Sequence, residues 1–158
     1  MNNEATLFAI DALETCGLSY MLVGSYSSNA YGVARATQDA DFVVELGDTS
    51  IVELGKRLAP SIRIDPQMSF ETVTMTRRYV AEVVSSPFRI EFFILDFDPY
   101  NQESFRRRRQ VSLMGRPIWI PSVEDVIVTK IRWAFLGNRS KDRDDVRDVI
   151  AVQADRID

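Results

Sequence analysis

Short apolar segments alternate along this chain with segments of helical periodicity, and this alternation most constrains the fold. Residues 20–23 and 88–95 are apolar runs bounded by turn residues, a pattern typical of buried strands. Residues 4–16 instead carry leucine and isoleucine at helical spacing and stop at Gly17. Because strands and helices are interspersed and some strands are separated only by short turns, we expect an α+β fold with a mixed β-sheet flanked by helices.

The same patterns predict the individual elements. Hairpins are expected around residues 85–87 and 115–116, and two C-terminal helices are expected from Ser122 and from about Ser140. We expect a single domain over residues 1–158, with the sheet in residues 1–120 and the helical part in 121–158. The expected strands are 20–23, 40–46, 79–84, 88–95, 111–114 and 117–120; the other expected helices are 4–16, 25–34, 49–59 and 99–109; the expected apolar stripes of the two C-terminal helices are Ile127, Ile131, Ala134 and Phe135, then Val146, Val149 and Ile150.

The composition excludes several kinds of chemistry. The 158 residues contain no histidine and one cysteine, so a Ser-His-Asp triad, a histidine-ligated metal and a disulfide framework are excluded. Catalysis would have to use carboxylates, Lys, Arg, Ser, Tyr or a metal held by oxygen ligands. The lone Cys16, an acidic N-terminus without a basic leader and the polar character of residues 15–34 predict a cytoplasmic protein with no membrane partner.

The charge distribution argues against a nucleic-acid coat protein. The net charge is −4, and the most basic run is the four arginines at 106–109. Such a run could meet phosphates, but a solvated helix end is the favoured interpretation for an acidic chain.

Gly24 and Ser25 form a possible phosphate site. An apolar strand ends there and a helix begins, so glycine would let a ligand approach the backbone while the helix N-terminus and the serine hydroxyl offer donors. The alternative is an ordinary strand-to-helix turn with Ser25 as N-cap.

Asp39 and Asp41 form a possible metal site. Residues two apart in a strand point to the same face, so the two carboxylates project together, and a cation would relieve their repulsion. Oxygen ligands favour Mg²⁺ or Mn²⁺. The alternative is a solvated pair on an edge strand or in a turn.

Glu91 is the candidate third carboxylate. It interrupts the strongly apolar residues 88–95, so it needs a partner or an open strand face. The alternative is an ion pair with Arg89 or another base, and Asp96 is the fallback as a third acid.

The C-terminal helices carry a further charged group. Lys130 lies beside the apolar stripe, so its stem could pack while its ammonium reaches a phosphate. Asp142 and Asp145 share a helix face with Val149. The favoured interpretation pairs them with Lys130 or with a neighbouring arginine, Arg139 or Arg143.

Taken together, these motifs resemble the DNA-polymerase-beta-like nucleotidyltransferase superfamily, and in particular its small prokaryotic members of the abortive-infection toxin type. The resemblance rests on Gly24-Ser25, residues 30–32, Asp39-x-Asp41, the strand 88–95 and the pair of C-terminal helices, with Arg35 and Thr37 between the first motifs. It covers most of residues 20–150. It implies a nucleotidyltransferase fold.

The resemblance also implies roles for individual residues. Asp39, Asp41 and Glu91 would bind divalent ions and act in catalysis, although a glutamate replaces the usual aspartate at the third position. The NTP co-substrate would be bound by a second group of residues, in which Asp142 supports the lysine: Gly24, Ser25, Arg35, Thr37, Lys130 and Asp142.

The expected function is Mg²⁺-dependent transfer of a nucleoside monophosphate from an NTP to an acceptor hydroxyl on a tRNA, a protein or a small molecule. A toxin-like role with a cognate antitoxin is part of the same expectation. The alternative is a catalytically reduced protein of this fold that binds a nucleotide or a partner without turnover.

Overall fold

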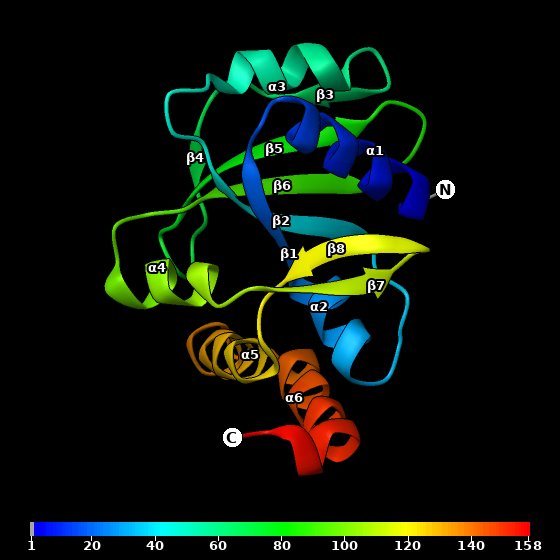
Figure 1. The fold of residues 1–158 in the computed structure, drawn as a ribbon. Helices are drawn as coiled ribbons and strands as arrows, with labels where there is room; N and C mark the ends of the chain where they lie inside the picture. The colour runs from blue at the N-terminus through cyan, green and yellow to red at the C-terminus, as the bar shows by residue number, and fades with distance from the viewer. Residues whose placement is uncertain (1) are drawn as a thin grey trace.

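The computed structural model describes residues 2–158 and contains a sheet between helical layers (Figure 1). Within this range no helix is long and apolar enough to cross a membrane. The elements in chain order are α1 (Asn2–Thr15), β1 (Ser19–Val23), α2 (Gly24–Tyr31), β2 (Asp39–Glu45), α3 (Ile51–Leu58), β3 (Ile62–Ile64), β4 (Ser69–Phe70), β5 (Arg77–Val83), β6 (Arg89–Ile94), α4 (Pro99–Arg106), β7 (Arg109–Leu113), β8 (Arg116–Ile120), α5 (Val123–Gly137), α6 (Ser140–Gln153) and the short 3₁₀ helix η1 (Ala154–Arg156).

The main sheet has six strands and mixed pairing. Its order is β1-β2-β6-β5-β3, and β4 pairs with β5. Only β2 and β6 run parallel, while the other pairs are antiparallel. Strands β7 and β8 form a separate hairpin. The expected α+β fold with a mixed sheet, both hairpins and two C-terminal helices is therefore confirmed.

The two faces of the sheet have different surroundings because side chains alternate along each strand. On β2, Ala40, Phe42 and Val44 are fully buried in the core that α1 and α3 cover. The ring of Phe42 stacks on Phe92 of β6 at a centroid distance of 5.6 Å. The alternate residues of β2, which include Asp39 and Asp41, point to the opposite face of the sheet. The core therefore fixes which side of the sheet carries the carboxylates.

Helix α5 buries only part of the predicted apolar stripe, because Ala134 is buried and Ile127 is half-buried but the other two residues are exposed. Its inward residues include Val126, Lys130 and Ala134, whereas Ile131 is 51% exposed and Phe135 is 83% exposed. The stripe prediction is therefore confirmed for Ala134 and wrong for Ile131 and Phe135. Helix α5 is apolar on several sides, so apolar spacing alone does not identify the buried face. On α6, Val149 is buried as expected, but Ile150 is exposed.

Helices α5 and α6 pack against α2 (Figure 1). The Tyr31 hydroxyl donates to the carbonyl oxygen of Pro121 (2.7 Å), two residues before α5 begins. A Cβ on Gly32 would lie 3.1 Å from both the backbone nitrogen and the Cγ2 of Val149 on α6. This separation is tighter than ordinary van der Waals contact, so a glycine at this position lets α2 and α6 pack together.

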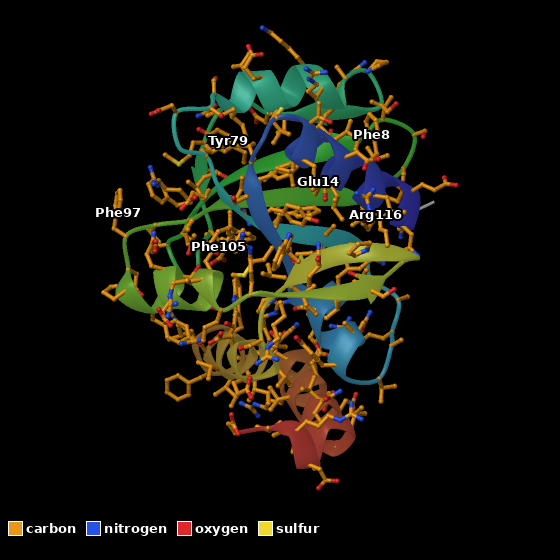
Figure 2. All side chains as sticks on the ribbon, in the orientation of Figure 1. Phe8, Glu14, Tyr79, Phe97, Phe105 and Arg116 are labelled. Carbon is orange, nitrogen blue, oxygen red and sulfur yellow. The ribbon has the colours of Figure 1, made fainter. Side chains whose placement is uncertain are left out.

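The arginine run matches the expected solvated helix end in part: Arg106, Arg107 and Arg109 are exposed, whereas Arg108 is half-buried. Helix α4 ends at Arg106, and the last arginine of the run begins β7. Arg107 pairs with the buried Asp125 (2.6 Å), and Arg108 lies 4.3 Å from the centroid of Phe105. Phe105, labelled in Figure 2, is itself buried on α4. Arg107 thus connects α4 to α5 through Asp125, and Arg108 connects it to β8, because its guanidinium also lies 4.9 Å from the ring centroid of Trp119.

Candidate active site

A cavity of about 330 Å³ lies between the sheet and the two C-terminal helices. Seven of the nine candidate residues line it, and the other two, Arg35 and Thr37, contact the lining residues from behind. The seven are Gly24, Ser25, Asp39, Asp41, Glu91, Lys130 and Asp142.

The three candidate carboxylates share one face of the sheet. Asp39 and Asp41 lie two residues apart on β2, and Asp41 is the register partner of Glu91 on the parallel strand β6. Their side chains therefore point into the same cavity. Glu91 also accepts a hydrogen bond from Arg78 Nη1 on β5 (3.2 Å). Glu91 therefore forms the ion pair expected as the alternative to a metal-binding role, but with Arg78 in place of Arg89.

Asp41 carries an unfavourable charge. Burial, followed by repulsion from Asp39 and Glu91, raises the pKa of Asp41 from 3.8 to about 7, and Lys130 only partly opposes this. A cation bound between these carboxylates would relieve the repulsion.

Asp39 and Asp41 fit a hard divalent cation because they offer oxygen ligands from one strand face with uncompensated charge. Among residues 2–158, however, no three acidic side chains come close enough together to hold a metal ion. Glu91 is instead turned toward Arg78, with which it forms an ion pair. Glu91 as a third ligand stays a prediction that requires it to leave that arginine.

The turn between β1 and α2 places Ser25 at the cavity. Gly24 has a φ of +63°, and a Cβ there would overlap the carboxylate of Asp41. Val23 is the N-cap and gives no side-chain cap, so the interpretation of Ser25 as N-cap is wrong. Ser25 lies inside the first turn, where the amide groups have no helical partner. Glycine thus permits a close approach of this helix N-terminus to the carboxylates.

Ser25 is contacted by Arg35 from the loop before β2. Arg35 Nη2 donates to Ser25 Oγ (3.1 Å) and to Asp145 Oδ2 (2.8 Å), and Arg35 Nε donates to Asp145 Oδ1 (2.9 Å). The Asn29 side chain bonds both the N–H and the carbonyl oxygen of Arg35 (3.2 and 2.7 Å). Both the backbone and the guanidinium of Arg35 are therefore fixed.

Lys130 lies in the same ionic network. It is 7% exposed, and its Nζ donates to Asp142 Oδ1 (3.1 Å) and to Asp145 Oδ2 (2.9 Å). Arg139 Nε lies 3.1 Å from Asp142 Oδ2. The favoured interpretation of these aspartates as ion-pair partners of Lys130 and Arg139 agrees with this geometry, whereas Arg143 is not among their partners.

Thr37 acts on Asp39 and does not reach the cavity. Its hydroxyl donates to the backbone oxygen of Asp39 (2.9 Å) and lies 3.4 Å from Asp39 Oδ1. This placement orients the start of β2.

Comparison with solved structures identifies proteins of similar fold. The solution structure of the antibiotic-resistance factor ANT(2'')-Ia matches 96% of this chain and 85% of its own with a TM-score of 0.65 at 17% sequence identity. Its crystal structure with adenylyl-2''-tobramycin gives 0.64 at 14% identity, covering 94% of this chain and 88% of its own. The lincomycin-bound lincosamide antibiotic adenylyltransferase LnuA gives 0.63 at 12% identity, covering 94% and 96%.

The chain has the nucleotidyltransferase fold. No protein-family model matches the sequence, and a search of curated proteins finds no match. The structural likeness at this low identity concerns the fold alone.

Within this nucleotidyltransferase fold, the cavity also uses residues that the sequence patterns did not identify. Glu71 is buried beside β4; burial alone would raise its pKa, but hydrogen bonds from the Val73 and Thr74 amides and the Thr74 hydroxyl lower it. The sequence of residues 61–78 shows no clear helical or strand periodicity, so it predicts no position for Glu71 or Arg78. Asp145 was identified only as an ion-pair partner of the C-terminal helices, and its contact with Arg35 spans 110 residues of sequence.

The cavity separates charge between its two walls. Acidic groups predominate on the sheet side, and basic groups predominate on the helical side. On the sheet side and its loops are Asp39, Asp41, Glu71, Glu91 and Asp96 with Arg78; on α5, α6 and their connection are Lys130, Arg132, Arg139 and Lys141 with Asp142. A triphosphate would be attracted to the helical wall, and cations would be attracted to the sheet.

Proposed function

We propose that this protein is a nucleotidyltransferase that moves a nucleoside monophosphate from an NTP to a hydroxyl group of a small molecule. The observation that carries the proposal is that Asp39 and Asp41 face the Gly24–Ser25 turn within one cavity. The fold likeness supports it, because two of the similar structures contain adenylyl-2''-tobramycin and lincomycin.

The chain's own residues would bind and orient the nucleotide. The Ser25 hydroxyl and the free amides at the start of α2 would donate to phosphate oxygens. Lys130, supported by Asp142, would contact the triphosphate and stabilise charge on the departing pyrophosphate. The acceptor oxygen would bond to the α-phosphorus as the bond to pyrophosphate breaks, and the hydroxyl proton would pass to a carboxylate, for which Glu91 is the candidate.

Asp39 and Asp41 would hold Mg²⁺ or Mn²⁺, with Glu91 as an additional ligand once it leaves Arg78. Bound there, the ion would neutralise the triphosphate and align the acceptor hydroxyl.

The test is an acceptor panel with labelled NTPs and Mg²⁺ or Mn²⁺, in which aminoglycosides, lincosamides, tRNA and proteins are compared by label transfer and pyrophosphate release. Asp41→Ala should abolish transfer, and Asp144→Asn, which changes an exposed carboxylate of α6, should leave it unchanged. Equal activity of wild type and Asp41→Ala, or no transfer to any acceptor, would contradict the proposal.

A binding module without turnover is the second candidate, and the Arg78–Glu91 ion pair favours it because this pair occupies a carboxylate that catalysis would need. Calorimetry distinguishes the two: metal-dependent binding of ATP with no pyrophosphate release in any acceptor mixture would identify a binding module.

The narrower expectations of the sequence resemblance stay predictions. These are the abortive-infection toxin type, a cognate antitoxin, and a tRNA or protein acceptor. Label transfer to tRNA or protein in the same panel would favour them over the small-molecule acceptor.

A further inference from the structure

The contact of Arg35 with Ser25 determines what the serine hydroxyl can do. A hydroxyl group has one proton to donate, and Ser25 Oγ already accepts from Arg35 Nη2 (3.1 Å). Within residues 2–158 no group accepts a hydrogen bond from Ser25 Oγ, and the residue lines the cavity. The guanidinium therefore leaves the hydroxyl proton free to point toward a ligand in the cavity.

Arg35 keeps this position because of Asp145. Arg35 Nε and Nη2 donate to the two carboxylate oxygens of Asp145, at 2.9 and 2.8 Å. This bidentate arrangement fixes the plane of the guanidinium group. The Asp145 side chain is almost completely buried on the inner face of α6. Hydrogen bonding and charge then outweigh burial and lower its pKa to about 2, so the carboxylate is ionised in any neutral buffer.

The same carboxylate also holds the candidate phosphate-binding lysine. Asp145 Oδ2 accepts from Lys130 Nζ (2.9 Å) as well as from Arg35. One buried side chain thus connects the serine turn of α2 with the lysine of α5, although the cavity is lined by Ser25 and Lys130 and not by Asp145.

We propose that Asp145 is a positioning residue for nucleotide binding: it holds Arg35 against Ser25 Oγ so that the hydroxyl donates to a phosphate, and it sets the place of the Lys130 ammonium on the other side of the same phosphate site. This role rests on the proposed function. In this role Arg35 supports Ser25 and does not itself contact the nucleotide, contrary to what the sequence resemblance implies for Arg35.

The experiment measures the affinity of the full chain for ATP with Mn²⁺ by calorimetry. Asp145→Asn should weaken binding about tenfold or more, because asparagine carries no charge and keeps only one of the two oxygens that accept from Arg35 and Lys130. Asp144→Asn is the matched control, since it removes the same charge from the preceding, 67% exposed position of α6 and should change the affinity little.

A double-mutant cycle separates positioning from general support of the fold. If Asp145 acts through Arg35 on the serine hydroxyl, then Asp145→Asn in a Ser25→Ala background should cost clearly less affinity than it does in the wild type. Additive losses would overturn the route through Ser25. Should Asp145→Asn not fold, the cycle is run with Arg35→Met. The Arg35 side chain is one-third exposed, so this substitution disturbs the fold less, and coupling with Ser25→Ala remains the deciding result.

The outcomes distinguish this inference from the proposed function. Wild-type protein that does not bind ATP with metal would refute the proposed function itself. Wild-type protein that binds ATP, together with an Asp145→Asn variant as tight as Asp144→Asn, would leave the proposed function standing and overturn the role of Asp145.

Discussion

Asp41→Asn tests whether the Asp41 carboxylate, which lines the cavity, carries an uncompensated charge. The pKa of Asp41 is about 7 in the folded chain against an ordinary value of 3.8, because the side chain is desolvated and faces Asp39 and Glu91. One pKa unit corresponds to about 1.4 kcal/mol, so the ionised carboxylate costs the folded state up to about 4 kcal/mol. Because the carboxylate borders the cavity, where water screens it, we expect asparagine to recover about 2–4 kcal/mol near pH 8.

The raised pKa of Asp41 also predicts how the free energy of unfolding changes with pH. Between about pH 4 and pH 7 the folded chain retains a proton on Asp41 that the unfolded chain has released. The contribution of this group to the free energy of unfolding therefore falls as the pH rises through that range and is constant above it. The stability difference between Asp41→Asn and wild type should be near zero at about pH 4 and largest above about pH 7.

Urea unfolding in metal-free buffer, followed by tryptophan fluorescence, measures the difference. Asp144→Asn is the control, because its exposed carboxylate should change stability by less than about 0.5 kcal/mol. Added Mg²⁺ should stabilise wild type and narrow the gap to the variant. An Asp41→Asn variant that is no more stable than wild type at about pH 8 without metal would refute the reasoning.

Three further predictions follow from other contacts of the site and its surroundings. Gly24→Ala places a methyl group against Asp41 at a positive φ, so chemical denaturation should show a loss on the order of 1–3 kcal/mol, and unchanged stability would contradict the close approach. Asp125→Asn weakens a buried hydrogen-bond network between α4 and α5 and should lower the thermal unfolding midpoint by about 3–8 °C in calorimetry; an unaltered midpoint would count against it. Arg78→Met frees Glu91 and should tighten Mn²⁺ binding at least about threefold in a titration followed by electron paramagnetic resonance, whereas weaker binding would mean that Arg78 does not compete with the metal.

The sheet and the placement of the carboxylates were accessible from sequence because they depend on local patterns. Alternation along β2 puts Asp39 and Asp41 opposite the buried Phe42, and the apolar strand around Glu91 is unmistakable. The parallel register of Asp41 with Glu91 then follows from pairing that the core imposes. The pairing of Glu91 with Arg78 did not follow, because residues 61–78 lack a clear period.

The helical side was harder to predict because its specificity is ionic and long-range. Helix α5 carries apolar residues on several sides, and the side that faces inward includes the charged Lys130. That burial is possible only because Asp142 and Asp145 neutralise the ammonium. No local pattern links Arg35 to Asp145, since the two meet only when the whole fold is assembled.

The tight packing at Gly32 affects how mutations in this protein would be interpreted. Any larger residue there must push against the backbone of α6 at Val149, four positions beyond Asp145 on the same helix. A displaced α6 would move the carboxylate that Arg35 and Lys130 share, although Gly32 itself does not line the cavity. If the protein binds a nucleotide as we propose, a random mutagenesis screen for lost binding would identify this glycine together with the ligand contacts, although it only lets two helices pack closely.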